Sequence, residues 1–242
     1  MSDAYQNVSN DGLNSFVGQQ RLTNILKIAV VSSQQREGVL SHILLTGPRG
    51  SGKSTLAKAV AYELGVNIKT ISFNSIRSAS DLAAILTSVG DREVILAESF
   101  DSIKQDCIEV LVTAMESFCI NIVIGKGAGA RSVCIDLPRF TLIATMDTQK
   151  TLPNKLVTCF PIIWQMEDYS ANDLKKLAKR YVHLLNVEIT DEAAEEIAKH
   201  SQGSYRQLTN MMKRARDFAI VKGNGKITTD ILPYITGMDL ND

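Results

Sequence analysis

Apolar residues along the chain fall into two kinds of segment, short continuous runs and longer stretches with helical spacing. The short runs are bounded by turn residues, predict buried strands, and cover residues 42–46, 67–73, 93–97 and 141–145. Helical spacing covers residues 22–31, 54–64 and 104–117. Strands that alternate with helices predict an α/β domain whose parallel sheet is covered by helices on both faces.

The pattern changes twice in the second half of the chain. Residues 121–127 and 131–136 are β-rich segments beside a glycine turn, which predicts a β-hairpin inserted at about residues 119–137. From about Ser170 onward helical spacing covers residues 171–185, 191–200 and 205–222, and no further strand is expected. We therefore expect an α/β domain over residues 1–168 and a small helical domain over residues 169–242.

Composition narrows the class of protein. With 242 residues, of which 45% are hydrophobic and 21% charged, the chain can bury a sizeable core. Lys plus Arg total 26 and Asp plus Glu total 26, so net charge gives no general attraction to nucleic acid. The polar start is unlike a targeting peptide, and no apolar stretch approaches the roughly 20 residues that span a bilayer. We expect a cytoplasmic protein without a membrane partner.

Cysteine spacing gives no sign of a metal site. Cys107, Cys119, Cys134 and Cys159 lack a CxxC pair and do not cluster with the histidines. We expect reduced, mostly buried thiols that behave as small apolar side chains.

One motif carries specific chemistry. Gly47-Pro48-Arg49-Gly50-Ser51-Gly52-Lys53-Ser54 matches GxxxxGK[ST] and lies after an expected strand and before an expected helix. Glycines let backbone N–H groups wrap a phosphate, while the helix N-terminus adds positive potential. Lys53 would reach the β and γ phosphates, and the Ser54 hydroxyl would hold Mg²⁺. The alternative is a plain glycine turn, but a buried-looking lysine at this spacing needs an anion.

Further segments resemble those of the RuvB family, the AAA-type ATPase motors that drive branch migration of Holliday junctions in DNA recombination and repair. Besides the phosphate loop they are LNSFVGQ at 13–19, IVIGKG at 122–127, ARS at 130–132, IDLPRFTLI at 135–143, GSYR at 203–206 and RARDFA at 214–219. The resemblance covers nearly the whole chain. It implies an AAA-type P-loop domain followed by a helical lid domain.

The resemblance also implies a nucleotide site for ATP or ADP with Mg²⁺. Val17 and Gly18 would line the adenine pocket, and the residues from Gly50 to Thr55 would hold phosphates and Mg²⁺. Tyr169 would touch the nucleotide from the domain junction. Arg206 matches the lid arginine that senses the γ phosphate; the alternative from pattern alone is a solvated helix charge.

Partners follow from the same resemblance. The family's hairpin docks the RuvA protein, so Ile122, Ile124 and Val133 would present an apolar strand face to a RuvA-like partner. From pattern alone, an ordinary hairpin that packs on its own domain has equal weight. The chain would also join itself or an active homologue in a ring. It ends about where the family begins a winged-helix domain, so that domain is absent from this sequence, either because the sequence stops short of it or because the protein lacks it. In both cases we expect this chain to reach DNA through partners.

Three parts that the family needs for hydrolysis depart from its pattern. The acidic pair after the second core strand becomes Ala97-Glu98, which keeps the water-orienting glutamate but loses the carboxylate that orders Mg²⁺. The two sensor threonines fall on Met146 and Asp147, with Thr145 adjacent if the register shifts by one.

The third departure concerns the arginines that reach a neighbouring subunit's site. They fall on Val157 and Cys159, and an arginine finger accounts for on the order of 10³ to 10⁵ in rate. Together the three losses favour a subunit of an ATPase and DNA helicase family that binds nucleotide but hydrolyses it weakly or not at all, acting as a ring or regulatory subunit. One alternative is a working branch-migration ATPase in which Glu98 suffices. Another is a protein-binding adaptor with a relic phosphate loop.

Overall fold

The computed structural model describes residues 12–124, 131–147, 152–222 and 225–236. A five-stranded parallel sheet forms its centre, in the order β2-β3-β6-β1-β7. The strands are β1 (Ile43–Thr46), β2 (Ile68–Ser72), β3 (Val94–Glu98), β6 (Thr141–Met146) and β7 (Ile162–Gln165). The parallel order brings the carboxyl ends of β1, β3 and β6 to one edge of the sheet, where their following loops meet.

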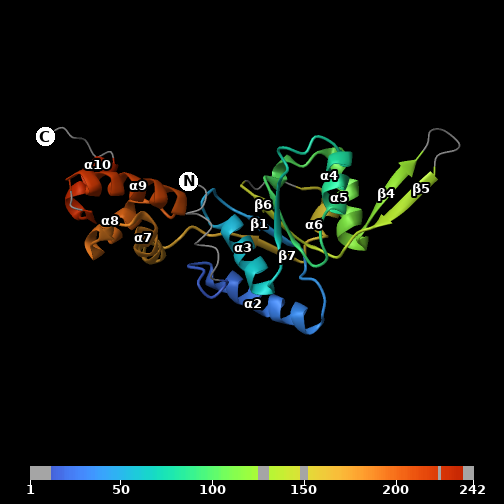
Figure 1. Ribbon diagram of the computed structural model, residues 1–242, viewed down its shortest axis with the longest axis horizontal. Helices are drawn as coiled ribbons and strands as arrows, with labels where there is room; N and C mark the ends of the chain where they lie inside the picture. Colours follow the sequence, from blue (N-terminus) through green and yellow to red (C-terminus); the bar gives the residue numbers. More distant parts are fainter. Residues whose placement is uncertain (1–11, 125–130, 148–151, 223–224, 237–242) are drawn as a thin grey trace.

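Helices cover both faces of this sheet (Figure 1). On one face lie α2 (Gln20–Gln35) and α3 (Lys53–Leu64), and on the other α4 (Ala79–Thr87) and α5 (Gln105–Ser117). Side chains of β3 alternate between the two cores, with Val94 and Leu96 facing α3 and Ile95 and Ala97 facing α5. The short helices η1 (Phe100–Ser102) and α6 (Asn154–Val157) complete the α5 side.

A two-stranded hairpin extends away from the sheet beyond α5 (Figure 1). Its strands β4 (Cys119–Ile124) and β5 (Arg131–Asp136) are antiparallel, and the backbone N–H of Leu137 donates to the carbonyl of Phe118 at 2.7 Å to close the base. Ile120 is buried in the α5-side core, so among the hairpin side chains that the structure describes, those at the base pack on the domain.

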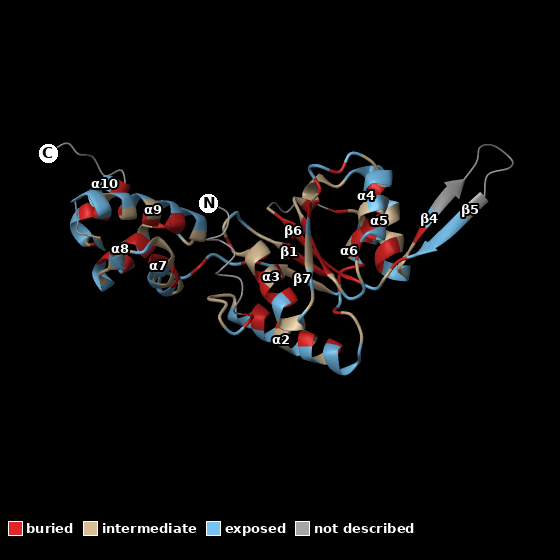
Figure 2. Ribbon diagram, viewed as in Figure 1, coloured by how far each residue is buried: buried red, intermediate tan, exposed pale blue. Residues whose placement is uncertain are grey.

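The rest of the chain is a helical domain with its own core (Figure 2). It contains α7 (Ala171–Leu185), α8 (Asp191–His200), α9 (Tyr205–Lys222), η3 (Thr229–Ile231) and α10 (Leu232–Thr236). Ser170 and Thr190 cap α7 and α8 by accepting backbone N–H groups. The expected fold class, a parallel sheet covered by helices and then a helical domain, is confirmed.

Some local expectations were wrong. Strands do not stop at Ser170, because β8 (Glu188–Ile189) pairs with β9 (Lys226–Ile227) inside the helical domain. The cysteines are free, but Cys134 is exposed on the projecting hairpin and Cys119 is half-buried.

Within the described ranges no helix has the length and hydropathy of a membrane span. The same ranges hold no cluster of three His, Cys, Asp or Glu side chains arranged for a metal ion.

Candidate functional site

The loop from Gly47 to Gly52 joins β1 to α3 and contacts the helical domain at two glycines. Gly50 has a φ of +87°, and a Cβ there would lie 2.9 Å from the backbone nitrogen of Arg206. Gly52 has a φ of +93°, and its Cβ would lie 2.5 Å from the Tyr169 hydroxyl. Both positions need the left-handed backbone and the missing side chain of glycine. The helical domain is therefore docked directly on this loop.

Lys53 begins α3 and is almost fully buried, with 8% of its side chain exposed. Its ammonium Nζ donates to the backbone carbonyls of Gly47 at 2.8 Å and Pro48 at 2.9 Å. It also lies 3.1 Å from Oδ1 of Asp147, whose Oδ2 accepts from Nε of Arg49 at 2.6 Å. The anion that the lysine required is thus present in the chain itself.

The two neighbouring cations change the pKa of the Asp147 carboxyl. Burial acts to raise its pKa, but the hydrogen bonds from Arg49 and Lys53 outweigh burial and hold the pKa below its ordinary value. Asp147 follows directly after β6 and keeps a side chain that is 35% exposed. It is therefore ionised at neutral pH and shared between two cations.

The Ser54 hydroxyl and the Glu98 carboxylate lie next to this cluster. Ser54 donates to Oε1 of Glu98 at 2.6 Å, which joins the start of α3 to the end of β3. Thr145, on β6, donates to the backbone carbonyl of Ala97 at 3.3 Å. Parallel pairing of β3 with β6 therefore sets Glu98 and Thr145 side by side at the carboxyl edge of the sheet.

These groups line a pocket of about 380 Å³, which we call the open pocket. Its lining consists mainly of polar and charged side chains from the loop, β3, β6 and the first turn of α9, namely Arg49, Lys53, Ser54, Thr55, Glu98, Ser99, Thr145, Asp147, Tyr205 and Arg206, with Gly50 and Gly52. Arg206 is exposed, so it faces this pocket without being locked in the core.

The loop of residues 47–52 has donor groups that fit a bound phosphate. The hydroxyl of Ser51 is buried and has no hydrogen-bond partner within the described part of the chain. A buried hydroxyl without a partner, a buried ammonium and the N-terminus of the 12-residue helix α3 all face the same loop. Such donors suit an anion with several oxygens.

The positions that the resemblance assigned to altered hydrolysis motifs lie mostly in the core. Ala97 is fully buried on the α5 side of the sheet, and Met146 packs in the same core. Val157 packs against it, while the Cys159 thiol lies 3.2 Å from the Lys155 carbonyl and burial raises its pKa to about 11. Of the three sensor candidates, Thr145 and Asp147 line the open pocket and Met146 does not.

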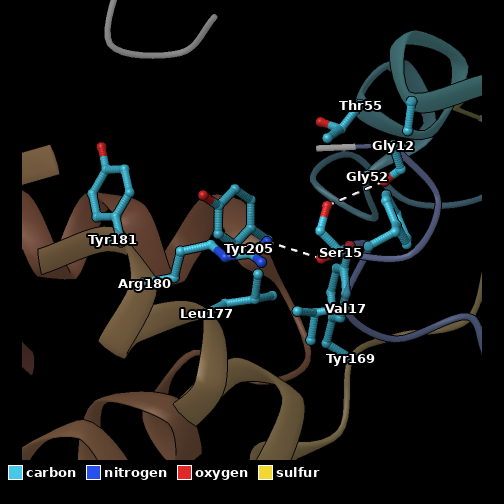
Figure 3. Close-up of a pocket in the computed structure, with 12 residues that line it drawn as sticks. Gly12, Ser15, Val17, Gly52, Thr55, Tyr169, Leu177, Arg180, Tyr181 and Tyr205 are labelled. Carbon is cyan, nitrogen blue, oxygen red and sulfur yellow. Dashed lines mark hydrogen bonds between the residues drawn. The ribbon is translucent and has the colours of Figure 1, made fainter. Parts of the chain in front are cut away.

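A second, smaller pocket of about 70 Å³ lies between the N-terminal loop and the helical domain, and we call it the enclosed pocket (Figure 3). Aromatic and aliphatic side chains dominate its lining, which comprises Phe16, Val17, Ala59, Tyr169, Leu177, Tyr181 and Tyr205, with Gly12, Ser15, Gly52, Thr55 and Arg180. Arg180 on α7 donates from Nη1 to the backbone carbonyl of Ser15 at 2.9 Å across the pocket. Its apolar and aromatic lining is of the kind that packs on a planar base, while its volume lies below the roughly 300–1,000 Å³ of small-molecule sites.

Gly18 was predicted to line the adenine pocket together with Val17. In the structure it does not line the enclosed pocket. It lies behind Tyr169, and a Cβ at Gly18 would come within 2.9 Å of two ring carbons. Gly18 thus supports the ring that lines the pocket. Burial raises the pKa of the Tyr169 phenol, which stays protonated at neutral pH.

The predicted partner surface lies on the projecting hairpin. Val133 is 42% exposed, and its backbone is paired with that of Ile122. The side chains of Ile122 and Ile124 lie outside the described residues. Ile135, which is 38% exposed, shares a strand face with Val133 and was missed, although the two-residue alternation of β5 indicates it.

Three further site residues were missed. Arg180 and Tyr205 belong to helices that the sequence predicts, but no spacing rule indicates that they face the loop of residues 47–52. Asp147 was noted only as a departure from the sensor pattern, and its pairing with Arg49 and Lys53 spans almost a hundred residues of sequence.

Comparisons with known proteins match both domains. The model of the Holliday junction DNA helicase RuvB P-loop domain covers residues 8–166, and that of the RuvB AAA lid domain covers residues 169–235. The RuvB Holliday junction branch migration motor of Thermotoga maritima is 33% identical over 96% of this chain and 72% of that chain, with a TM-score of 0.84. A point mutant of that protein is 35% identical over 94% and 72% of the two chains, with a TM-score of 0.85.

Proposed function

The chain belongs to the RuvB family, and from this premise we propose that it binds ATP or ADP with Mg²⁺ and hydrolyses ATP weakly or not at all. A P-loop domain of this family implies nucleotide binding, and the internal fit of the loop supports it. On this proposal the base enters the enclosed pocket beside Val17 and Tyr169. The phosphates lie along the loop from Gly47 to Gly52, next to Lys53.

One observation carries the second half of the proposal: the loop is complete, whereas Ala97, which the resemblance aligns with the carboxylate that orders Mg²⁺, is a buried methyl. Ser54 remains to hold Mg²⁺, and Glu98 remains to orient water. Arg206 faces the open pocket, where it suits contact with a terminal phosphate. We therefore expect the chain to bind ATP tightly and to hydrolyse it slowly or not at all.

The chain is proposed to act in an assembly, as a ring or regulatory subunit beside copies of itself or an active homologue. Val157 and Cys159 pack on the core and offer no guanidinium to a neighbouring subunit. The exposed face at Val133 suits a RuvA-like partner, with DNA reached through such partners. We propose domain limits of 1–168 and 169–242, since separate hydrophobic cores lie on either side of residue 168.

The test is to measure nucleotide binding and turnover on the same preparation, alone and mixed with an active RuvB. At about 100 times the Kd, bound nucleotide should raise the unfolding free energy by about 2.7 kcal/mol, hence Tm by about 5 °C or more. Turnover should stay at background. Lys53→Ala, which removes the ammonium, is the control that should lose the thermal shift.

A working branch-migration motor is the second candidate, because Glu98 and Thr145 both line the open pocket. It predicts ATP turnover stimulated by junction DNA with a RuvA-like protein, abolished in Glu98→Gln. Brisk turnover that depends on Glu98 would refute weak hydrolysis. A missing thermal shift with millimolar Mg-ATP in both the parent chain and Lys53→Ala would instead favour an adaptor with a relic loop.

A further inference from the structure

The carboxylate of Asp147 lies where the phosphate loop presents its two cationic side chains. One oxygen is 3.1 Å from Lys53 Nζ and the other is 2.6 Å from Arg49 Nε, so each oxygen has its own cation. Both cations belong to the loop motif, and Asp147 comes from the end of β6. We propose that Asp147 is an internal competitor for the terminal phosphate, which makes the site favour a nucleoside diphosphate over a triphosphate.

The hydrogen-bond capacity of Lys53 supports this competition. An ammonium has three N–H donors, and Lys53 directs them to the Gly47 carbonyl, the Pro48 carbonyl and Asp147. A new anionic oxygen must therefore displace one of these three partners. Of the three, Asp147 alone is charged, so its release separates the only full ion pair that Lys53 makes in the described residues.

The position of Asp147 determines which phosphate is affected. Loop N–H groups wrap the α and β phosphates, and Lys53 reaches the β phosphate of either nucleotide, so displacing Asp147 from Lys53 costs a diphosphate and a triphosphate alike. A third phosphate extends into the open pocket toward Glu98, where Asp147 also lies. There it meets a second negative charge, and close like charges in a partly buried site disfavour binding. A diphosphate ends before that point.

The inference rests on the proposed nucleotide binding and is tested by affinity rather than turnover. Isothermal titration calorimetry of the purified chain would compare ADP with a non-hydrolysable ATP analogue, with and without Mg²⁺. The parent chain should bind ADP at least about tenfold more tightly than the ATP analogue. Asp147→Asn should tighten analogue binding and reduce this preference to about threefold or less.

Two control variants separate charge from shape. Asp147→Glu keeps the carboxylate and should keep the preference for ADP. Asp91→Asn removes a carboxylate whose side chain is 70% exposed and which lies outside the pocket, so the preference should not change. Circular dichroism would check that each variant is folded.

Three results would overturn the inference: equal affinities in the parent chain, an unchanged preference in Asp147→Asn, or weaker binding of the Mg²⁺-loaded analogue in Asp147→Asn. The last result would make Asp147 a supporting group for the ion. If neither nucleotide binds to the parent chain, the proposed function and this inference both fail. If the parent chain binds ADP, Lys53→Ala loses that binding, and Asp147→Asn keeps the preference for ADP, the inference is refuted while the proposed function stands.

Discussion

The enclosed pocket and the open pocket share Gly52, Thr55 and Tyr205 but differ in the chemistry of the rest of their linings. Aromatic and aliphatic side chains from the N-terminal loop and the lid line the enclosed pocket, which measures about 70 Å³. Charged side chains at the ends of β3 and β6 line the open pocket, which is about 380 Å³. Such a division suits a ligand with a planar apolar end and a multiply charged end.

The comparison also separates what the chain keeps from what it has changed. Val17 and Tyr169, which the resemblance assigned to the nucleotide, line the enclosed pocket. Of the positions that the resemblance assigned to hydrolysis and that differ from its pattern, Asp147 lines the open pocket and is paired with Lys53, whereas Ala97 and Met146 pack in the α5-side core.

Gly52→Val should have the largest effect, because it blocks both pockets at once. A side chain there meets the Tyr169 hydroxyl at 2.5 Å and must adopt a φ of +93°. We expect about a hundredfold or greater loss of nucleotide affinity, and about 3 kcal/mol lower unfolding free energy. Calorimetry and urea titration would measure these changes.

Gly65→Val is the matched control for this change. Gly65 has a φ of +70° but no atom within 4 Å of its Cβ position, so it carries the backbone strain without the steric conflict. It should lose about 1–2 kcal/mol of stability and keep its nucleotide affinity. Equal loss of affinity in both variants would break the assignment of Gly52 to the site.

Ala97→Asp tests whether a carboxylate near the end of β3 restores turnover. The side chain is fully buried, so a charge there should lower the unfolding free energy by about 1–3 kcal/mol. Turnover should stay low, because Val157 and Cys159 still supply no arginine. Ala97→Asn separates the cost of added size from that of charge. Full turnover in Ala97→Asp would show that a single substitution disabled the site.

A pH series probes the core at the amino ends of β1 and β6, at the edge of the sheet opposite the open pocket. His42 accepts the Leu142 backbone N–H at Nδ1 (2.9 Å), with Nε2 3.2 Å from the Met115 carbonyl. Burial lowers the pKa of His42, outweighing the Met115 hydrogen bond. The unfolded chain therefore takes up this proton first, and stability falls as pH drops from about 6.5 toward the folded-state pKa, by about 1 kcal/mol per unit. This slope should disappear in His42→Gln and persist in the exposed control His183→Gln, whereas an unchanged slope in both would exclude His42 as its source.

Arg180→Ala should have the smallest effect and concerns the enclosed pocket alone. It removes the 2.9 Å hydrogen bond to the Ser15 carbonyl that spans the pocket. We expect about 1 kcal/mol lower stability and a severalfold weaker affinity for adenine nucleotides. Its neighbour Lys179 makes only a surface ion pair with Asp191, so Lys179→Ala should change affinity little. Affinity that is equal in the two variants would remove Arg180 from the site.

Regular amphipathic segments were predicted well from the sequence. The spacing over residues 171–185, 191–200 and 205–222 gives α7, α8 and α9 with their bounds, because long helices with one buried face have a clear period. Helix α4 was missed although Ser78 and Asp81 form a capping box, since nine residues show too few turns of periodicity. Strand β7 has four residues and follows Pro161, which hid it as well.

The phosphate loop was predicted because its chemistry is local in sequence, and the structure keeps its residues together. The role of Asp147 was not predicted, since its two partners come from a loop that only the parallel order of β1 and β6 brings near. Gly18 was assigned to a pocket wall because a resemblance transfers position but not the direction in which a residue faces. Both gaps concern contacts between distant segments, which periodicity does not encode.

The close contacts at Gly50 and Gly52 have a mechanical consequence for the lid. The start of α9 and the ring of Tyr169 rest on the same few backbone atoms that would wrap a phosphate. A movement of a few tenths of an ångström in that loop must be accommodated by rotation of the whole helical bundle, because its packed interior does not deform. Displacement in a rigid rotation grows with distance from the pivot, so α10, at the far end, would travel furthest (Figure 1).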